Sequence, residues 1–325
     1  MVRERGILFA GGGTGGHLYP GIALAQSLSG RRLFLCTERP FDRSALDAAR
    51  LPYRVLPSPR LSPSFPVRFG RAVAESLRAL REFRPDVLVG LGGYGSVPPV
   101  AAAMLLGIPY VLLEQNIRPG KANRALAPMA ARVYAQWRET RLPGRVVAAG
   151  SPIRPGLRRI PKSQACARLG LDPDRPTVLV LGGSQGAGAL NALDLDVQTI
   201  RITGRGRTAR GTVVLEYLDE MELAYSAADL AVSRAGALAI AELACFGLPT
   251  VLVPYPHAAD DHQRANARAL GDAVWVVEES EIGRIAEIVA KLVSADPEVH
   301  NRGRALQRFA RPEAARTIAE DLSSI

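Results

Sequence analysis

Residues 6–17, GILFAGGGTGGH, decide the fold, because an apolar run passes there directly into a loop of glycines. The run from Gly6 to Ala10 predicts a buried β-strand, and Pro20 lies near the start of the helix expected after the loop. Glycines let a ligand approach the backbone closely, and the amides and dipole of a helix N-terminus attract a phosphate. This stretch therefore predicts an α/β domain with a phosphate-binding loop.

The loop alone leaves two ligand classes open. Gly11, Gly13 and Gly16 fit the spacing of a dinucleotide-binding fingerprint, and Glu38 lies where the ribose-binding acid of such a site would be. His17, at the predicted helix start, has no role in that interpretation. A histidine titrates near neutral pH, so His17 suits a general base; it equally suits a residue that fixes the loop by hydrogen bonding.

The pattern of strand, glycine loop and helix occurs a second time. A predicted strand over 177–181 runs into the glycines of 182–186, where Ser184 is placed to hydrogen-bond a phosphate. Apolar runs alternate with helical patterns along the whole chain, which indicates parallel sheets covered on both faces. The predicted strands are 6–10, 32–37, 87–90, 110–114, 177–181, 229–233, 250–254 and 274–277.

A segment rich in proline and arginine, residues 152–161, separates the two patterns and predicts a linker. We expect one Rossmann-like domain over residues 1–152 and a second over 153–325, with the final helix, about 304–325, packing back on the first. Ligands of doubly wound folds bind at the carboxyl ends of the strands. The fold class is therefore α/β, with two doubly wound domains facing a cleft that holds the site.

Composition narrows the class of protein. A net charge of +10 and a pI near 10.1 over 325 residues indicate anionic partners, such as phosphates or an anionic lipid surface. Cys36, Cys166 and Cys245 lack the spacing of a metal or disulfide site, which favours a reducing compartment. The uncharged stretch 87–113 is broken by glycines and prolines, so we expect no membrane span there, and the N-terminal apolar run is too short for a signal peptide.

Polar side chains follow several predicted strands. Tyr94 lies in a glycine turn, and Asn116 follows a strand directly. Further on, Glu242 lies on a predicted helix where a carboxylate can bind ribose hydroxyls, and Gln263 and Asn266 lie at a helix start where amides can bind a sugar. Each residue also fits a structural role as a cap, a turn residue or a solvated side chain.

As a set and in this order, these motifs resemble the MurG family, the UDP-N-acetylglucosamine transferases that convert undecaprenyl-linked lipid I into lipid II in peptidoglycan synthesis. Several motifs in a fixed order are more specific than one glycine loop. The resemblance covers residues 12–20, 92–98, 114–123, 150–154, 182–187, 216–221, 234–242 and 249–267. It implies the GT-B fold and an inverting transfer without a chemical cofactor, in which UDP-GlcNAc is a co-substrate and a divalent cation at most an aid.

The resemblance also implies the reaction and the partners. The 4-hydroxyl of the N-acetylmuramoyl sugar of lipid I would attack the anomeric carbon of UDP-GlcNAc, and UDP would leave. His17 would be the catalytic base. No residue of the chain is expected to bind a metal ion. The expected partners are UDP-GlcNAc, undecaprenyl-diphosphate-linked lipid I, the anionic inner-membrane surface and cell-wall synthesis proteins, with no nucleic acid, and the expected location is peripheral, on the cytoplasmic face of the cell membrane.

Substrate-binding roles follow from the resemblance as well. The first glycine loop would serve mainly the acceptor and the second the donor. The implied residues are Thr14, Gly15 and Gly16 at the phosphates, Tyr94 in the turn facing the cleft, Asn116 at the transferred sugar, Arg154 and Ser184 at the nucleotide or its diphosphate, Leu218 at uracil, Ala237 and Leu238 as amide donors, Glu242 at ribose, and Gln263 and Asn266 at N-acetylglucosamine.

Residues 65–83 predict a basic amphipathic helix with two interpretations. Phenylalanine, valine and leucine alternate there with arginines, a pattern suited to an anionic lipid surface. The same pattern fits an ordinary surface helix whose apolar face packs into the core. A lipid-linked acceptor favours the membrane interpretation.

The chain departs from the family pattern in two places. The region 187–212 is shortened, and Ala239 stands where the family often has threonine, which places donor affinity in question. The rival functions are another GT-B transferase acting on a lipid or natural-product acceptor, a UDP-sugar epimerase, and a non-catalytic UDP-sugar-binding scaffold. An NAD-dependent dehydrogenase ranks last, because the second glycine loop would then have no role.

Overall fold

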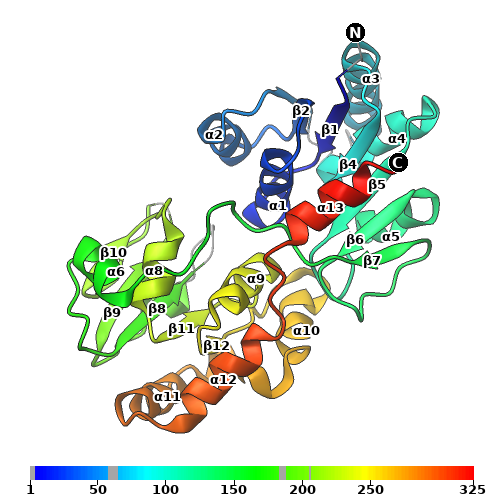
Figure 1. The fold of residues 1–325 in the computed structure, drawn as a ribbon. Coiled ribbons are helices and arrows are strands. Elements are labelled where there is room, and N and C mark those ends of the chain that lie inside the picture. The colour runs from blue at the N-terminus through cyan, green and yellow to red at the C-terminus, as the bar shows by residue number, and fades with distance from the viewer. Residues whose placement is uncertain (1–3, 58–64, 183–187, 205) are drawn as a thin grey trace. The chain divides into compact units, whose positions relative to one another are not determined.

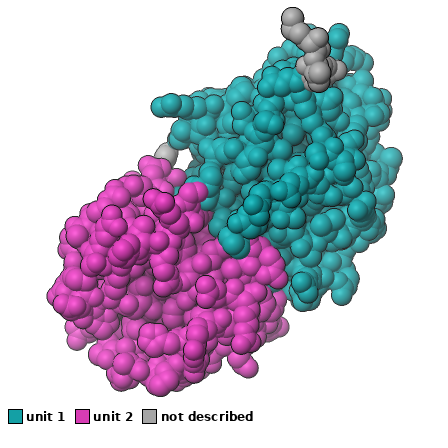
Figure 2. Space-filling view, in the orientation of Figure 1, with its two compact units in different colours: residues 1–155, 312–325 teal, residues 156–311 magenta. Residues whose placement is uncertain are grey.

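The structure, a computed structural model, describes residues 4–57, 65–182, 188–204 and 206–325. The chain forms two compact units (Figure 2). Unit 1 contains residues 1–155 and 312–325, and unit 2 contains residues 156–311. The boundary between the units therefore lies after residue 155, three residues beyond the expected boundary after residue 152. The chain returns to unit 1 at residue 312.

Unit 1 is built on a seven-stranded parallel sheet with the order β3-β2-β1-β4-β5-β6-β7. The central strand β1 pairs with β2 on one side and β4 on the other, so that Phe9 lies beside both Phe34 and Val89. The winding therefore reverses between β1 and β4, and the loops after these strands are neighbours. The strands are β1 (Gly6–Ala10), β2 (Arg31–Cys36), β3 (Tyr53–Val55), β4 (Val87–Gly90), β5 (Tyr110–Glu114), β6 (Arg132–Ala135) and β7 (Val146–Ala148).

Helices cover both faces of this sheet (Figure 1). Leu18 of α1 and Ile318 of α13 belong to the core on one face, whereas Leu80 of α3 and Val100 of α4 belong to the core on the other. The strands are thereby shielded from water on both sides. The helices are α1 (Gly15–Gln26), α2 (Pro40–Ala48), α3 (Phe65–Phe83), α4 (Val97–Leu105), α5 (Lys121–Leu126) and α13 (Ala314–Leu322), with the 3-10 turns η1 (Tyr94–Ser96) and η2 (Ala127–Met129).

Unit 2 repeats the architecture with a six-stranded parallel sheet in the order β10-β9-β8-β11-β12-β13. Here β8 pairs with β9 and β11, so the winding reverses between β8 and β11. The strands are β8 (Thr177–Leu181), β9 (Gln198–Ile202), β10 (Val213–Leu215), β11 (Leu230–Ser233), β12 (Thr250–Leu252) and β13 (Trp275–Val276). The helices are α6 (Lys162–Leu169), α7 (Gly188–Asn191), α8 (Met221–Ala227), α9 (Ala237–Phe246), α10 (His262–Arg268), α11 (Arg284–Val293) and α12 (Pro297–Gln307), with η3 (Ala259–Asp261), η4 (Gly271–Ala273) and η5 (Glu279–Glu281).

The prediction of two doubly wound domains is confirmed. The stretch 87–113 forms β4, η1, α4 and β5, as its glycines and prolines predicted, and α3 has the predicted bounds. Within the described residues, no helix combines the length and the hydrophobicity needed to cross a bilayer. Five strands were not expected: β3, β6, β7, β9 and β10.

The C-terminal segment divides between the units, whereas the sequence suggested that all of 304–325 packs on the first domain. Helix α12 stays in unit 2, where Gly303 packs so closely that an added Cβ would stand 2.6 Å from the carbonyl oxygen of Gly247. Only α13 joins unit 1. There Asp321 forms an ion pair with Arg132 at 3.0 Å and accepts a hydrogen bond from the Tyr134 hydroxyl at 2.7 Å.

Candidate functional site

The loops that carry the predicted site residues follow the strands at which each sheet reverses its winding. In unit 1 these are the loop after β1 and the turn after β4, and in unit 2 the loops after β8 and β11. Such reversal points leave a crevice outside the carboxyl ends of the strands, where α/β folds bind ligands. Each unit therefore has one position suited to a substrate.

A buried carboxylate shapes the first glycine loop. Asp42, on the first turn of α2, is fully buried and accepts hydrogen bonds from the amide of Gly13 at 2.8 Å and the hydroxyl of Thr37 at 2.6 Å. Gly12 and Gly13 have φ values of +146° and +87°, and a Cβ on Gly12 would stand 2.3 Å from an Asp42 oxygen. The Gly13 amide is thus committed to Asp42, and the amides at the α1 start, including Gly15 and Gly16, are those that helix geometry leaves for a ligand.

His17 lies at the start of α1 against the turn after β4. Its Nδ1 is 3.1 Å from the hydroxyl oxygen of Thr14. A Cβ built on Gly92 or Gly93 would stand 3.3 or 3.4 Å from the nearest atom of the imidazole ring, so the ring packs closely against both glycines. The structure therefore brings Thr14, His17 and the glycine turn together, and this arrangement is compatible with both roles considered for His17.

The segment after β5 is organised by Glu114. This carboxylate is 3% exposed and accepts hydrogen bonds from the amides of Asn116 and Gly120 and from the side chain of Asn123, each at 2.9 Å. Burial raises the pKa of Glu114 against the lowering effect of these donors. Asn116 itself is half-buried. Glu114 and Asn123 hold the turn that presents Asn116.

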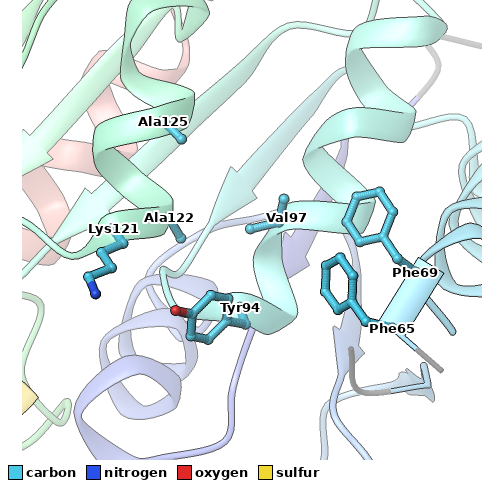
Figure 3. Close-up of a pocket in the computed structure, with 7 residues that line it drawn as sticks. All are labelled: Phe65, Phe69, Tyr94, Val97, Lys121, Ala122 and Ala125. Atoms are coloured by element: carbon cyan, nitrogen blue, oxygen red, sulfur yellow. The ribbon is translucent and has the colours of Figure 1, made fainter. Parts of the chain in front are cut away.

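Tyr94 lines an open groove of about 210 Å³ in unit 1 (Figure 3). The residue is 53% exposed. Apolar side chains from the start of α3, from α4 and from α5 make up most of the lining, and Lys121 contributes the only charged group among the lining residues. The lining residues are Phe65, Phe69, Tyr94, Val97, Lys121, Ala122 and Ala125.

Arg154 lies just before the chain passes from unit 1 into unit 2, and it is half-buried. Its guanidinium carbon is 5.2 Å from the ring centroid of Tyr19 on α1. This contact belongs to the cation–π class. The contact ties Arg154 to the helix whose N-terminus carries Thr14, Gly15 and Gly16.

In unit 2 the described part of the second glycine loop ends at Gly182, so Ser184 lies outside the described residues. The loop after β11 leads through Gly236, the N-cap residue of α9, into Ala237 and Leu238, the first residues of the helix. Leu218 is half-buried in the segment between β10 and α8. Ala237 and Leu238 therefore lie in the first turn of α9, where backbone amides have no partner within the helix.

Glu242 lies on α9 and is only 3% exposed. The hydroxyl of Tyr225, on α8, donates a hydrogen bond to Glu242 Oε2 at 2.7 Å. The interpretation of Glu242 as a solvated surface residue is therefore wrong, because its carboxylate is held in a buried pair.

Gln263 and Asn266 lie on α10 but have different environments. The Oε1 of Gln263 accepts a hydrogen bond from the Tyr255 amide at 2.9 Å. Asn266 is fully buried, and its side-chain amide donates to the carbonyl of Ala235 at 3.2 Å. In this structure Asn266 therefore supports the loop before α9 and does not reach a ligand surface, in contrast to the expected sugar contact.

Sequence reasoning did not assign roles to Asp42, Asn123, Tyr225 or Arg234. Arg234 is 9% exposed, donates to the carbonyl of Val253 at 3.2 Å and pairs with Glu279. Acidic residues in a first helical turn and single tyrosines are too common to mark these positions without knowledge of what they contact. Among the described residues, no group of three or more histidine, cysteine, aspartate or glutamate side chains could hold a metal ion.

The sequence matches two family models. The glycosyltransferase family 28 N-terminal domain matches residues 7–135, and the glycosyltransferase family 28 C-terminal domain matches residues 196–318. The first match covers β1 to β6 of unit 1, and the second covers most of unit 2 and part of α13.

Relatives match over nearly their full length. The UDP-N-acetylglucosamine--N-acetylmuramyl-(pentapeptide) pyrophosphoryl-undecaprenol N-acetylglucosamine transferase of Moorella thermoacetica is 36% identical, with 97% of each chain covered. The protein of the same name from Halorhodospira halophila is 38% identical, also with 97% of each chain covered.

Solved structures agree with the fold. The crystal structure of Acinetobacter baumannii MurG has a TM-score of 0.78 at 26% identity, covering 99% of this chain and 100% of that one. UDP-GlcNAc 2-epimerase from Neisseria meningitidis has a TM-score of 0.69 at 14% identity, with the same coverage, a likeness of fold alone. The two parallel sheets and these neighbours establish the two-domain GT-B fold. By its domain matches and its identity to these relatives, the chain belongs to the MurG family of glycosyltransferases.

Proposed function

We propose that the chain transfers N-acetylglucosamine from UDP-GlcNAc to the 4-hydroxyl of the N-acetylmuramoyl sugar of undecaprenyl-linked lipid I, forming lipid II. The observation that carries the proposal is the identity of 36% to a relative named for this transfer, with 97% of both chains covered. The loops at both reversal points hold residues suited to its two substrates.

On the acceptor side, the diphosphate of lipid I would bind at the N-terminus of α1. Thr14, Gly15 and Gly16 lie there, and a Cβ on Gly16 would meet nothing within 4 Å, which is consistent with open space for a ligand. The Gly13 amide does not take part, because it is bonded to Asp42. Arg154 adds positive charge near this helix through its contact with Tyr19.

His17 would take the proton of the attacking hydroxyl. In the tautomer whose Nδ1–H donates to Thr14, Nε2 carries the lone pair that would accept that proton. The hydroxyl oxygen then forms the β-1,4 bond to the anomeric carbon, and the bond from that carbon to the diphosphate breaks as UDP departs. This displacement needs a base and stabilisation of the leaving diphosphate, and no chemical cofactor.

On the donor side, the first-turn amides of Ala237 and Leu238 would meet the nucleotide, Leu218 the uracil and Glu242 the ribose. Gln263 would bind the N-acetylglucosamine through its side-chain NH₂, because its oxygen is engaged by the Tyr255 amide. Asn266 would act indirectly, by holding Ala235 in the loop before α9.

Incubation of the pure protein with labelled UDP-GlcNAc and a short-chain lipid I analogue tests the proposal. We expect release of UDP in equal amount to the disaccharide product. Donor binding without turnover of this acceptor would reject the proposed transfer and support a role in UDP-sugar binding instead.

The role of His17 has its own test. If His17 is the base, His17→Ala should lower kcat by about 10²–10⁴-fold with the KM for UDP-GlcNAc little changed. Circular dichroism and thermal unfolding check that the loop against Gly92 and Gly93 survives. Near-normal kcat in a folded variant would assign His17 to shaping the loop instead.

We also propose that unit 1 contacts the membrane surface through the start of α3, on the cytoplasmic face where the nucleotide sugar is available. The later part of this helix packs into the core through Ala72, Ala79 and Leu80, which supports the core interpretation for that part. Val67, in contrast, is 76% exposed, and Phe65 and Phe69 open into the groove of Figure 3. Arginines on the same helix would add attraction to anionic lipid.

Sedimentation with vesicles tests this contact. Val67→Asp should weaken binding to phosphatidylglycerol vesicles, because it places a negative charge on the proposed contact surface. Val293→Asp is the matched control, since Val293 is 56% exposed on α11 of unit 2. Equal vesicle binding by both variants would remove α3 from the membrane contact.

A further inference from the structure

Tyr225 and Glu242 form a buried pair that links two helices of unit 2. The two side chains are 2% and 3% exposed, and the phenol donates to Glu242 Oε2 at 2.7 Å. A polar group buried to this extent is costly unless hydrogen-bond partners hold it, and the bond from Tyr225 satisfies one oxygen of the Glu242 carboxylate.

The hydroxyl of Tyr225 can be separated from the packing of its ring. The ring centroid lies 4.9 Å from that of Phe246, with the planes tilted by 40°. Replacement by phenylalanine keeps this ring contact and removes only the donor. The contribution of the hydrogen bond can therefore be measured without opening a cavity.

We propose that Tyr225 is a positioning residue for the donor, which fixes the orientation of the Glu242 carboxylate so that it meets the ribose hydroxyls. The inference rests on the ribose role of Glu242 proposed above. A free glutamate side chain loses rotamer freedom when a ligand binds, and a hydrogen bond already made in the ligand-free protein removes that cost from binding. Tyr225 would thus increase affinity for the nucleotide without touching it.

A purely structural role makes a different prediction. If the bond only ties α8 to α9, its loss lowers the melting temperature and affects every nucleotide equally. If the bond orients Glu242 toward ribose, its loss weakens ligands that carry the ribose hydroxyls and spares those that lack them.

The test compares UDP with 2′-deoxy-UDP and 3′-deoxy-UDP by calorimetry, in the wild type and in Tyr225→Phe. We expect the Kd for UDP to rise about ten-fold, in line with one hydrogen bond to a charged group. The rise should be clearly smaller for at least one deoxy analogue. The KM for UDP-GlcNAc should rise with it while kcat changes little, because the residue does not touch the reacting atoms.

A double-mutant cycle tests whether Tyr225 acts through Glu242. In a Glu242→Ala background, Tyr225→Phe should cause no further change in the Kd for UDP. Tyr110→Phe is the matched control, because it removes a buried tyrosine hydroxyl that donates to the carbonyl of Leu126 at 2.7 Å in unit 1. This control should leave all three Kd values unchanged.

Three outcomes overturn the inference, and they distinguish the role of Tyr225 from that of Glu242. An equal loss of affinity for all three nucleotides in Tyr225→Phe, or no loss while Glu242→Ala weakens UDP, leaves the ribose role of Glu242 intact and rejects positioning by Tyr225. Unchanged UDP affinity in Glu242→Ala rejects the ribose role itself. Transfer to the lipid I analogue, measured separately, shows whether the proposed reaction stands in either case.

Discussion

At Gly12 the backbone and a buried carboxylate meet with no space between them. The residue has a φ of +146°, a region that side chains rarely adopt, and an added Cβ would stand 2.3 Å from an Asp42 oxygen. Asp42 in turn accepts the Gly13 amide and the Thr37 hydroxyl. The conformation of the glycine loop therefore depends on a contact with α2 as much as on its own sequence.

Gly12→Ala should therefore damage both fold and activity. The strained conformation and the clash with Asp42 should lower the free energy of unfolding by about 1–3 kcal/mol. Gly16→Ala makes the useful comparison, because its Cβ meets nothing within 4 Å in the ligand-free protein. It should unfold no more easily than the wild type and raise the KM for the acceptor if the ligand approaches this position. Equal melting temperatures for Gly12→Ala and the wild type would contradict the first expectation.

The position of an individual residue could be predicted where the sequence pattern fixes the local backbone. It could not be predicted where contacts between separate elements determine the environment of the side chain. The glycines and Thr14 of the first loop could be placed from the strand before them. Neither Asp42 nor Tyr225 could, since each acts on a residue at least 17 positions away. Asn266 was placed on the correct helix, but its burial depends on packing against the loop before α9.

Helix α10 is held in unit 2 by charge. Arg264 donates to both oxygens of Glu278, at 2.8 and 2.9 Å, and pairs with Asp261 at 3.0 Å. The hydrogen bond from Arg264 lowers the pKa of Glu278 below its usual value of 4.5. Gln263 precedes Arg264 on the same helix, so this ion pair fixes an element that we assign to donor binding.

Glu278→Gln should raise the KM for UDP-GlcNAc with a small loss of stability. Both partners are partly exposed, so we expect less than about 1 kcal/mol at neutral pH. Because the folded-state pKa is depressed, the contribution of Glu278 is present above pH 4.5 and is lost as the pH falls through the folded pKa. Urea unfolding of both proteins between pH 7 and pH 3 measures this, and the difference between them should shrink toward acid pH. A difference that grew on acidification would be inconsistent with the pair.

Among the elements, the sequence predicted α3 best, and it predicted strands such as β9 and β3 least. The amphipathic pattern predicted the bounds of α3, but only the later part of its apolar face packs into the core, and its start is the part that we propose contacts the membrane. The strand β9, with the sequence QTIRI, lacks a continuous apolar run, and β3 has only three residues. Such strands form because neighbouring strands supply backbone partners, which no local pattern records.

Unit 1 is assembled from two distant parts of the chain. Ile318 and Leu322 of α13 are 0% and 1% exposed and join the core cluster that contains Leu18 and Ile22 of α1. The sequence predicted that the C-terminus returns to the first domain. The sequence could not predict which unit each of the last two helices joins. Both α12 and α13 have apolar faces, and only packing determines which sheet each one covers.

Asp321 should therefore be essential to the stability of unit 1, although it lies 4 residues from the end of a chain of 325. It pairs with Arg132, whose side chain is 10% exposed, and accepts a hydrogen bond from Tyr134. Burial and this bond raise the pKa of Tyr134, so its contribution is present below the usual value of 10 and is lost as the pH rises above it. Asp321→Ala leaves a buried guanidinium without its carboxylate and should lower the free energy of unfolding by about 3 kcal/mol.

Glu320→Ala is the control, at an adjacent position with a 73% exposed side chain, and it should change the free energy of unfolding by no more than about 0.5 kcal/mol. Hydrogen exchange should locate the Asp321→Ala loss in β6, α1 and α13, whereas protection lost first in unit 2 would show that α13 does not stabilise the sheet it covers.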